Sequence, residues 1–247
     1  MKNFLFALLI TFSSGVVLAQ EGDDVGWVAR FGAAGGFTPG IVFPNLDPIN
    51  AQIKTLGIDN LSSSGMLILG GSGYVYVMLV DNLRVGGMGI GGTKTTSGTV
   101  QGLNKEVKYN YGFGGLTVEY SLPFISRIAV SVGTVIGAGS ASIDVYQNRD
   151  NFNWNSAWLN PSPLDPPGTA DNKSRTFTNT FFTITPTLNV DIPVNRFIAF
   201  RVGGGYIISF NNEWKADNNQ SIAGVPSDLK SNSFFIQTGI YFGLFAF

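Results

Sequence analysis

The chain has 247 residues, 13% of them charged, and its formal net charge of −1 lacks the basic excess expected of a protein that binds nucleic acid. It contains neither cysteine nor histidine, which excludes disulfides, thiolate and imidazole chemistry and the common zinc sites. The chain is rich in glycine and phenylalanine, yet beyond the N-terminus no apolar run reaches the roughly 18 residues that a transmembrane helix needs.

Residues 1–19 are predicted to be a signal peptide that is removed. Lys2 supplies a positive start, a short apolar segment runs from Phe4 to Phe12, and small or compact residues precede a cut before Gln20. Because the chain has no cysteine, a lipoprotein anchor is not expected. We therefore expect a single domain over residues 20–247, exported and held in a membrane by other means.

The first predicted strand runs from Gly26 to Phe37. Residues 40–63 then break the strand pattern with prolines, and we expect them to form a loop that contains a short helix at 47–57. Asp47 is predicted to cap this helix, Pro48 fits its first position and Gly57 ends it. The helix has an apolar face, and so short a helix is marginal alone, so that face must rest on another part of the protein.

Seven further strands are predicted from alternating apolar and polar residues, at 65–79, 83–97, 105–122, 127–146, 176–192, 197–214 and 231–247. The clearest alternation places Phe182, Ile184 and Leu188 opposite Thr183, Thr185 and Asn189. The connections between the eight strands alternate between long and short. This pattern predicts an all-β fold: an eight-stranded antiparallel transmembrane up-and-down β-barrel with short periplasmic turns and longer extracellular loops.

The last predicted strand, SNSFFIQTGIYFGLFAF, ends on an aromatic residue. We expect Tyr241, Phe245 and Phe247 to face lipid, which turns the alternate residues Ile240, Phe242 and Leu244 toward the lumen.

With these features the chain resembles the small bacterial outer-membrane barrels of the OmpA, OmpX and OmpW type. The resemblance implies an integral protein of the Gram-negative outer membrane, in contact with outer-membrane lipid and lipopolysaccharide. It also implies that Tyr241, Phe245 and Phe247 belong to the C-terminal signal read by the barrel assembly machinery. Barrels of this kind serve in adhesion, wall tethering, solute passage and lipid chemistry, so the fold does not settle the function.

Five charged residues are predicted to face inward near the periplasmic ends of their strands: Arg30, Arg84, Glu119, Asp191 and Arg201. Opposite charges in a narrow lumen can pair, whereas each would be costly to bury alone. A structural salt-bridge network is the favoured interpretation, because eight strands leave room for little more than side chains. A gate or a proton path through the same residues is the alternative.

Inward glycines leave open a different use of the lumen. A small hydrophobic ligand could fit beside an apolar lumen wall made by Tyr74, Tyr76, Met88, Ile90, Ile240, Phe242 and Leu244. The simpler interpretation is that glycine permits the bending and close approach that a narrow barrel needs.

The longest predicted loop mixes aromatic and amide side chains, namely Phe152, Asn153, Trp154 and Trp158. Such a mixture suits sugar rings or a protein surface. A loop that packs on itself, or an aromatic collar at the membrane boundary, explains it equally well.

No spacing of residues points to a catalytic, cofactor or metal site, and we expect a non-enzymatic outer-membrane protein with a role in envelope structure or in surface contact through its loops. The alternative is a carrier or narrow channel for a small hydrophobic solute, with the helix at 47–57 as a lid.

Overall fold

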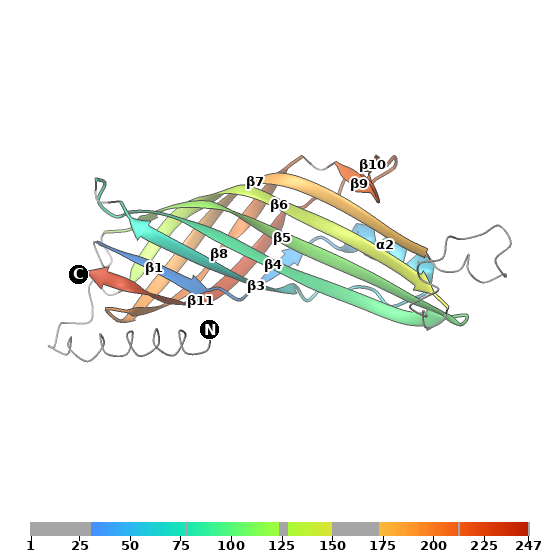
Figure 1. The fold of residues 1–247 in the computed structure, drawn as a ribbon, viewed down its shortest axis with the longest axis horizontal. Helices are drawn as coiled ribbons and strands as arrows, with labels where there is room; N and C mark the ends of the chain where they lie inside the picture. Colours follow the sequence, from blue (N-terminus) through green and yellow to red (C-terminus); the bar gives the residue numbers. More distant parts are fainter. Residues whose placement is uncertain (1–30, 78, 124–127, 150–172, 212, 247) are drawn as a thin grey trace, which may run out of the picture.

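The computed structural model describes residues 31–77, 79–123, 128–149, 173–211 and 213–246. The wall of the fold is a ring of eight antiparallel positions (Figure 1). In order these are β1 (Phe31–Phe37) with β2 (Gly40–Pro44), β3 (Met66–Tyr76), β4 (Leu83–Val100), β5 (Leu103–Ser121), β6 (Ala129–Asn148), β7 (Lys173–Asn195), β8 (Ile198–Phe210) and β11 (Ser233–Ala246). Each position pairs with the next, and β11 pairs with both β8 and β1, which closes the barrel.

β1 and β2 form one position of the wall, interrupted at Thr38 and Pro39. The pairing with β11 keeps the same register across the break, from Phe37 opposite Ile240 to Gly40 opposite Gln237. The prediction that a loop begins at residue 40 is therefore wrong. Proline lacks a donor but keeps its acceptor, and the Pro39 carbonyl accepts a hydrogen bond of 2.9 Å from the Thr238 amide.

The strands extend farther at one end of the barrel than the sequence predicts. Instead of a loop at 98–104, β4 and β5 are joined by Gln101 and Gly102 alone, with φ of 53° and 76°. A two-residue turn with positive φ at both positions matches the twist of the flanking strands. We call this end, which also carries the connections at 45–65 and 211–232, the long-loop end, and the opposite end the short-turn end.

The two faces of the strands differ as the alternation predicts. On β7, Thr185 and Asn189 are buried in the interior, whereas Ile184 and Leu188 point outward. The outward positions of β8 and β11 continue this apolar surface, and they include Phe200, Val202, Tyr206, Ile208, Phe210, Phe234 and Ile236. An apolar exterior around a closed barrel suits a lipid environment, because the backbone groups are satisfied within the wall.

The helix α2 (Asp47–Leu56) lies at the long-loop end, away from the tip of β11 (Figure 1). It begins one residue before Pro48, so Asp47 is its first residue rather than its cap; the Asp47 amide donates to Asn45 Oδ1 at 3.2 Å. Gly57, with φ of 77°, ends it as predicted. Among the residues that the structure describes, no helix is long and apolar enough to cross a membrane.

The predicted loop at 215–230 contains a small hairpin. β9 (Trp214–Ala216) pairs with β7 beyond the end of β8, and β10 (Gln220–Ser221) pairs with β9. The hairpin lies beside β7 in the half of the barrel that carries α2 (Figure 1).

Candidate functional site

The interior of the barrel has two parts. Near the short-turn end it is polar and charged, and toward the long-loop end it is apolar. Both parts are built from the inward positions of the same strands, so the division runs along the barrel axis.

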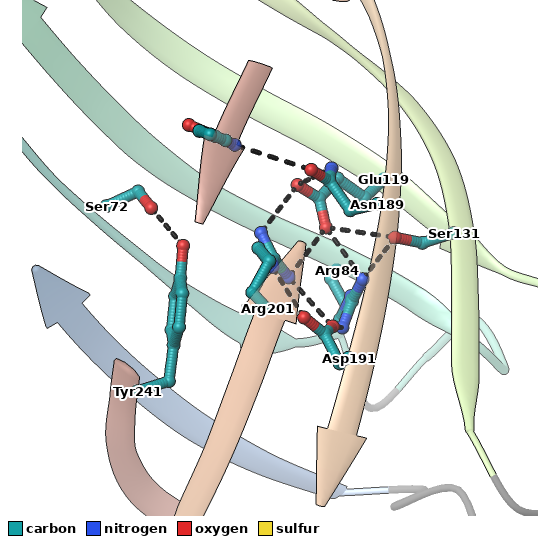
Figure 2. A network of polar contacts seen from close by, with 9 residues as sticks. Ser72, Arg84, Glu119, Ser131, Asn189, Asp191, Arg201 and Tyr241 are labelled. Atoms are coloured by element: carbon teal, nitrogen blue, oxygen red, sulfur yellow. Dashed lines mark hydrogen bonds and ion pairs between the residues drawn. The ribbon is translucent and has the colours of Figure 1, made fainter. Parts of the chain in front are cut away.

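The polar part is organised by four charged residues, Arg84, Glu119, Asp191 and Arg201, which we call the four-charge cluster (Figure 2). Arg84 contacts Glu119 at 2.7 Å and Asp191 at 2.5 Å. Arg201 contacts the same two carboxylates, at 3.1 Å and 2.5 Å. All four side chains are at most 6% exposed, so each charge depends on its partners rather than on water.

Strand register explains how residues distant in sequence meet in this cluster. Arg84 lies opposite Glu119 on β4 and β5, and Asp191 lies opposite Arg201 on β7 and β8. Each cross-strand pair therefore forms between adjacent strands, and the curvature of the barrel brings the two pairs together. The structure unites four of the five charges predicted to share the lumen, and the fifth, Arg30, lies outside the described residues.

Neutral polar side chains extend the hydrogen-bond network around the four charges. Ser131 accepts a bond of 2.5 Å from Arg84 Nη2, and Asn189 Nδ2 donates to Glu119 Oε1 at 3.2 Å. Gln237 Nε2 donates to Asn189 Oδ1 at 3.4 Å. These three residues were not singled out from the sequence. The inward positions of Ser131 on β6 and Asn189 on β7 follow from the alternation, whereas the orientation predicted for β11 would have placed Gln237 on the outer face.

Three tyrosine rings cover the two guanidinium groups. The Arg84 guanidinium carbon lies 4.4 Å from the ring centre of Tyr74, and Arg201 lies 4.9 Å from the same ring and 4.7 Å from that of Tyr241. Tyr76 is farther, at 5.8 Å from Arg84. Tyr74 and Tyr76 thus face the lumen as predicted. Their rings pack with Ala34, Ala199 and Tyr241 in a small buried cluster, and they also contact the cations.

The predicted orientation of the closing strand is wrong. Tyr241 is buried in the lumen at 1% exposure, where its hydroxyl bonds Ser72 Oγ (Figure 2). Ile240, Phe242 and Leu244, predicted to line the lumen, are 44%, 61% and 51% exposed on the outer wall.

The reason lies in the polar atoms of the strand. Gln237 and Tyr241 fall on the same face of β11, and each has polar atoms that need partners unavailable in lipid. Ile240 and Phe242 have no polar side-chain atoms and lose nothing by facing outward. Gln237 was the sequence signal that would have predicted this register.

The apolar part fills the rest of the interior. Met88 and Ile90, predicted to line the lumen, are 8% and 6% exposed and belong to its core. Other members from the wall include Val107, Tyr111, Phe113, Val135, Phe181, Ile207 and Phe235. Ile49 and Ile53 of α2 belong to the same core, so the apolar face of the helix rests inside the barrel as a plug.

Large side chains occupy the space beside the inward glycines. A Cβ atom placed on Gly139 would lie 2.6 Å from the Phe181 ring, and one on Gly205 would lie 3.0 Å from the Phe235 ring. At Gly133 the position is taken by the Glu119 side chain, at 2.8 Å. These glycines allow neighbouring groups to approach closely, and they do not leave a hollow channel.

The remaining predicted site residues are not described. Phe152, Asn153, Trp154 and Trp158 lie outside the described residues, as does Phe247, and the side chain of Phe245 is also not described. Within the described ranges, no group of three or more acidic side chains is placed to hold a metal ion.

Similar solved structures are outer-membrane proteins at low sequence identity. A major outer membrane protein from Thermus thermophilus has 8% identity and a TM-score of 0.48, with 86% of this chain and 99% of that chain covered. Ail, the attachment invasion locus protein of Yersinia pestis, solved with the heparin analogue sucrose octasulfate, has 11% identity and a TM-score of 0.38, with coverage of 87% and 99%. The outer membrane protease OmpT from Escherichia coli has 11% identity and a TM-score of 0.27, with coverage of 92% and 99%.

No family model matches the chain, and no curated protein matches its sequence. The architecture itself, eight antiparallel positions closed into a barrel with an apolar outer wall, is that of the small bacterial outer-membrane β-barrels.

Proposed function

We propose that this protein is a non-enzymatic integral protein of the bacterial outer membrane, closed to solutes, with a role in envelope structure or in contact through its outer loops. The apolar exterior supports the membrane location. By the usual sorting of loops in such barrels, the short-turn end faces the periplasm and the long-loop end faces outward.

One observation supports a closed barrel: side chains fill the interior at two levels along its axis. The four-charge cluster occupies the periplasmic part, and the apolar core with Ile49 and Ile53 of α2 occupies the outer part. A solute crossing the barrel would have to separate buried ion pairs and displace close-packed side chains. Both steps are costly, because charges without partners and cavities in a core are each destabilising.

The chemistry of the interior supports a non-enzymatic role. The chain has no histidine, and both carboxylates of the cluster are engaged by two arginines. Every carboxylate oxygen of the cluster already accepts a hydrogen bond from an arginine, so a substrate would have to displace an ion pair to reach one. The same pairing argues against the cluster as a proton path.

The corrected orientation of β11 bears on the alternative role as a carrier. Because Ile240, Phe242 and Leu244 face outward, they do not form the apolar lumen wall that was predicted for a hydrophobic solute. Passage through the filled barrel is therefore disfavoured.

Conductance in a planar lipid bilayer tests the closed state. We expect no stepwise conductance from the purified protein beyond rare short openings, with a wide porin inserted under the same conditions as the positive control. Stable conductance steps would contradict the proposal. A variant with Ile49 and Ile53 both changed to Asp to expel α2 would show whether the helix is the outer barrier, since openings should become more frequent.

Epitope insertion tests location and orientation. An epitope placed between Gln101 and Gly102, at the tip of the β4–β5 turn, should be labelled on intact cells. The same epitope at Asp81, in the turn between β3 and β4, should be labelled only after the outer membrane is permeabilised. Equal labelling of both sites on intact cells would contradict the assigned orientation.

A further inference from the structure

An apolar cavity of about 340 Å³ lies at the long-loop end, beside α2. The helix forms one side of it with Ile49 and Ile53, and the barrel wall forms a second side with Val145 of β6 and Phe177 of β7. The third side is the segment 222–229, which follows the β9–β10 hairpin. Three separate parts of the chain thus bound the cavity.

The side chains around the cavity specify an uncharged occupant. Among its described lining residues none is charged, and Gln52 is one of few with hydrogen-bonding groups. The Trp214 indole N–H also faces this region, but it already donates to the Leu229 carbonyl at 3.3 Å. A charged molecule would lose its hydration here and gain no ionic partner, so burial of a charge is excluded.

The volume suits a small molecule. An apolar cavity of about 150 Å³ is enough to hold benzene, and small-molecule sites begin near about 300 Å³. The space beside α2 is therefore large enough for an alkyl chain or a ring system larger than benzene. An unfilled apolar space forfeits packing contacts around its whole lining, so an occupant of matching chemistry would stabilise the surrounding elements.

The cavity reaches the outer surface through its third side. Ala223 and Gly224 line it and are exposed, and Gly224 has a φ of 76° that forms the bend of the segment. Two contacts hold the far end of the segment: the bond from Trp214 to Leu229, and a bond of 3.4 Å from Asn45 Nδ2, just before α2, to the Asp228 carbonyl. Entry from outside therefore does not require passage through the lumen.

We propose that this cavity is a binding site for a small uncharged apolar molecule, an alkyl chain or a hydrocarbon ring system, which enters from the outer face of the barrel. The site goes beyond the proposed envelope role and does not depend on whether the barrel conducts. The alkyl group can belong to a free hydrocarbon or to the acyl chain of an outer-leaflet lipid, which share the same chemistry.

Quenching of Trp214 fluorescence by 1-bromooctane tests the site. With the other three tryptophans of the chain changed to Phe, Trp214 is the sole indole reporter. We expect saturable quenching of the full-length protein in lipid nanodiscs. A parallel sample with brominated acyl chains and no bromooctane identifies the source: quenching there assigns the site to lipid chains, and its absence assigns it to free hydrocarbons.

Two variants narrow the cavity, Val145→Phe on the barrel wall and Val225→Phe on the outer segment. Each should weaken the apparent affinity for bromooctane at least tenfold. The matched control is Val132→Phe, on the lipid face of the same strand as Val145, and it should leave the affinity unchanged. Val225→Phe leaves the barrel wall intact, so it remains informative if Val145→Phe fails to fold.

The proposal is overturned if Trp214 shows no saturable quenching by either probe, or if the narrowed variants and Val132→Phe are quenched equally, which indicates partitioning into bulk lipid only. A crystal soaked with bromooctane should show the anomalous signal of bromine between α2 and residues 222–229. Because conductance is measured separately, failure of the closed-barrel proposal and failure of this site give different results.

Discussion

The two halves of the interior are stabilised by different kinds of interaction. In the polar half, four charges meet through two cross-strand pairs, and almost every contact is an ion pair, a hydrogen bond or a cation over a tyrosine ring. In the apolar half, aromatic and aliphatic side chains pack against glycines and against α2. The stability of the polar half depends on each charged or polar group keeping its partner. The stability of the apolar half depends on how well the side chains fill the available volume.

This difference predicts how each half responds to damage. Loss of one partner in the polar half leaves a buried charge, so the penalty should be large and should be relieved by removing the opposite charge. Loss of volume in the apolar half leaves a cavity, and the penalty should grow with the volume removed. A cavity of about 340 Å³ lies at the outer margin of the apolar half, where α2 and residues 222–229 meet the wall.

The largest effect is expected from Arg84→Met. The change leaves Glu119 and Asp191 with one arginine between them, and it should reduce the free energy of unfolding by about 3–5 kcal/mol. Urea titration in lipid vesicles, with the heat-dependent gel shift of barrels as readout, measures the loss. Replacing all four charges with uncharged residues of similar size should cost less than the single change. A single change that costs under about 1 kcal/mol would contradict the buried network.

The next effect is expected from Ile53→Ala on α2. Ile53 is 1% exposed in the apolar core, and its truncation should cost about 2–5 kcal/mol. Because a ten-residue helix is marginal alone, the loss should appear as local release of α2. Hydrogen exchange of the α2 amides measures it. Lys54→Ala, at the exposed neighbouring position, is the control and should leave exchange nearly unchanged.

A smaller effect is expected from Tyr241→Phe, which tests the register of the closing strand. The variant removes the hydroxyl that bonds Ser72 inside the barrel, and it should cost about 1–2 kcal/mol. Tyr206→Phe, on the outer wall, should be near neutral in the same titration. If Tyr206→Phe cost more stability than Tyr241→Phe, the result would favour the orientation in which Tyr241 faces lipid.

The smallest effect is expected at the tip of the long-loop end. Gly102→Ala places a side chain at a φ of 76° in an exposed turn and should cost about 1 kcal/mol. Gly89→Ala on the same hairpin is the control, because a Cβ atom there would have no neighbour within 4 Å. Equal losses of stability at both glycines would show that the positive φ of the turn does not cause the loss at Gly102.

Much of the barrel was predictable from local pattern. Alternation placed Thr185 and Asn189 inside and Ile184 outside, and proline and glycine marked the bounds of α2 within one residue. Two of the errors arose where a residue could satisfy either of two environments. Pro39 breaks a strand pattern but keeps an acceptor, and Tyr241 is both aromatic and polar, so neighbours on other strands decided both cases.

The candidate sites divide in the same way. Arg84, Glu119, Asp191 and Arg201 were predictable as inward charges, because each falls on the polar face of its strand. The bonds of Ser131 and Asn189 to this cluster were not predictable, because small polar residues are common on every inward face and acquire a role only from the residues that lie opposite them. The cavity beside α2 could not be predicted, because its sides lie far apart in the chain.

The sequence by itself determined that eight strand positions form the wall and, for every strand except the closing one, which face points inward, because both depend on residues within one strand. Only the tertiary structure decided the orientation of the closing strand, the partners of the buried charges and the filling of the glycine-lined interior. These depend on contacts across the barrel, where polar groups must find partners and side chains must fill a shared volume.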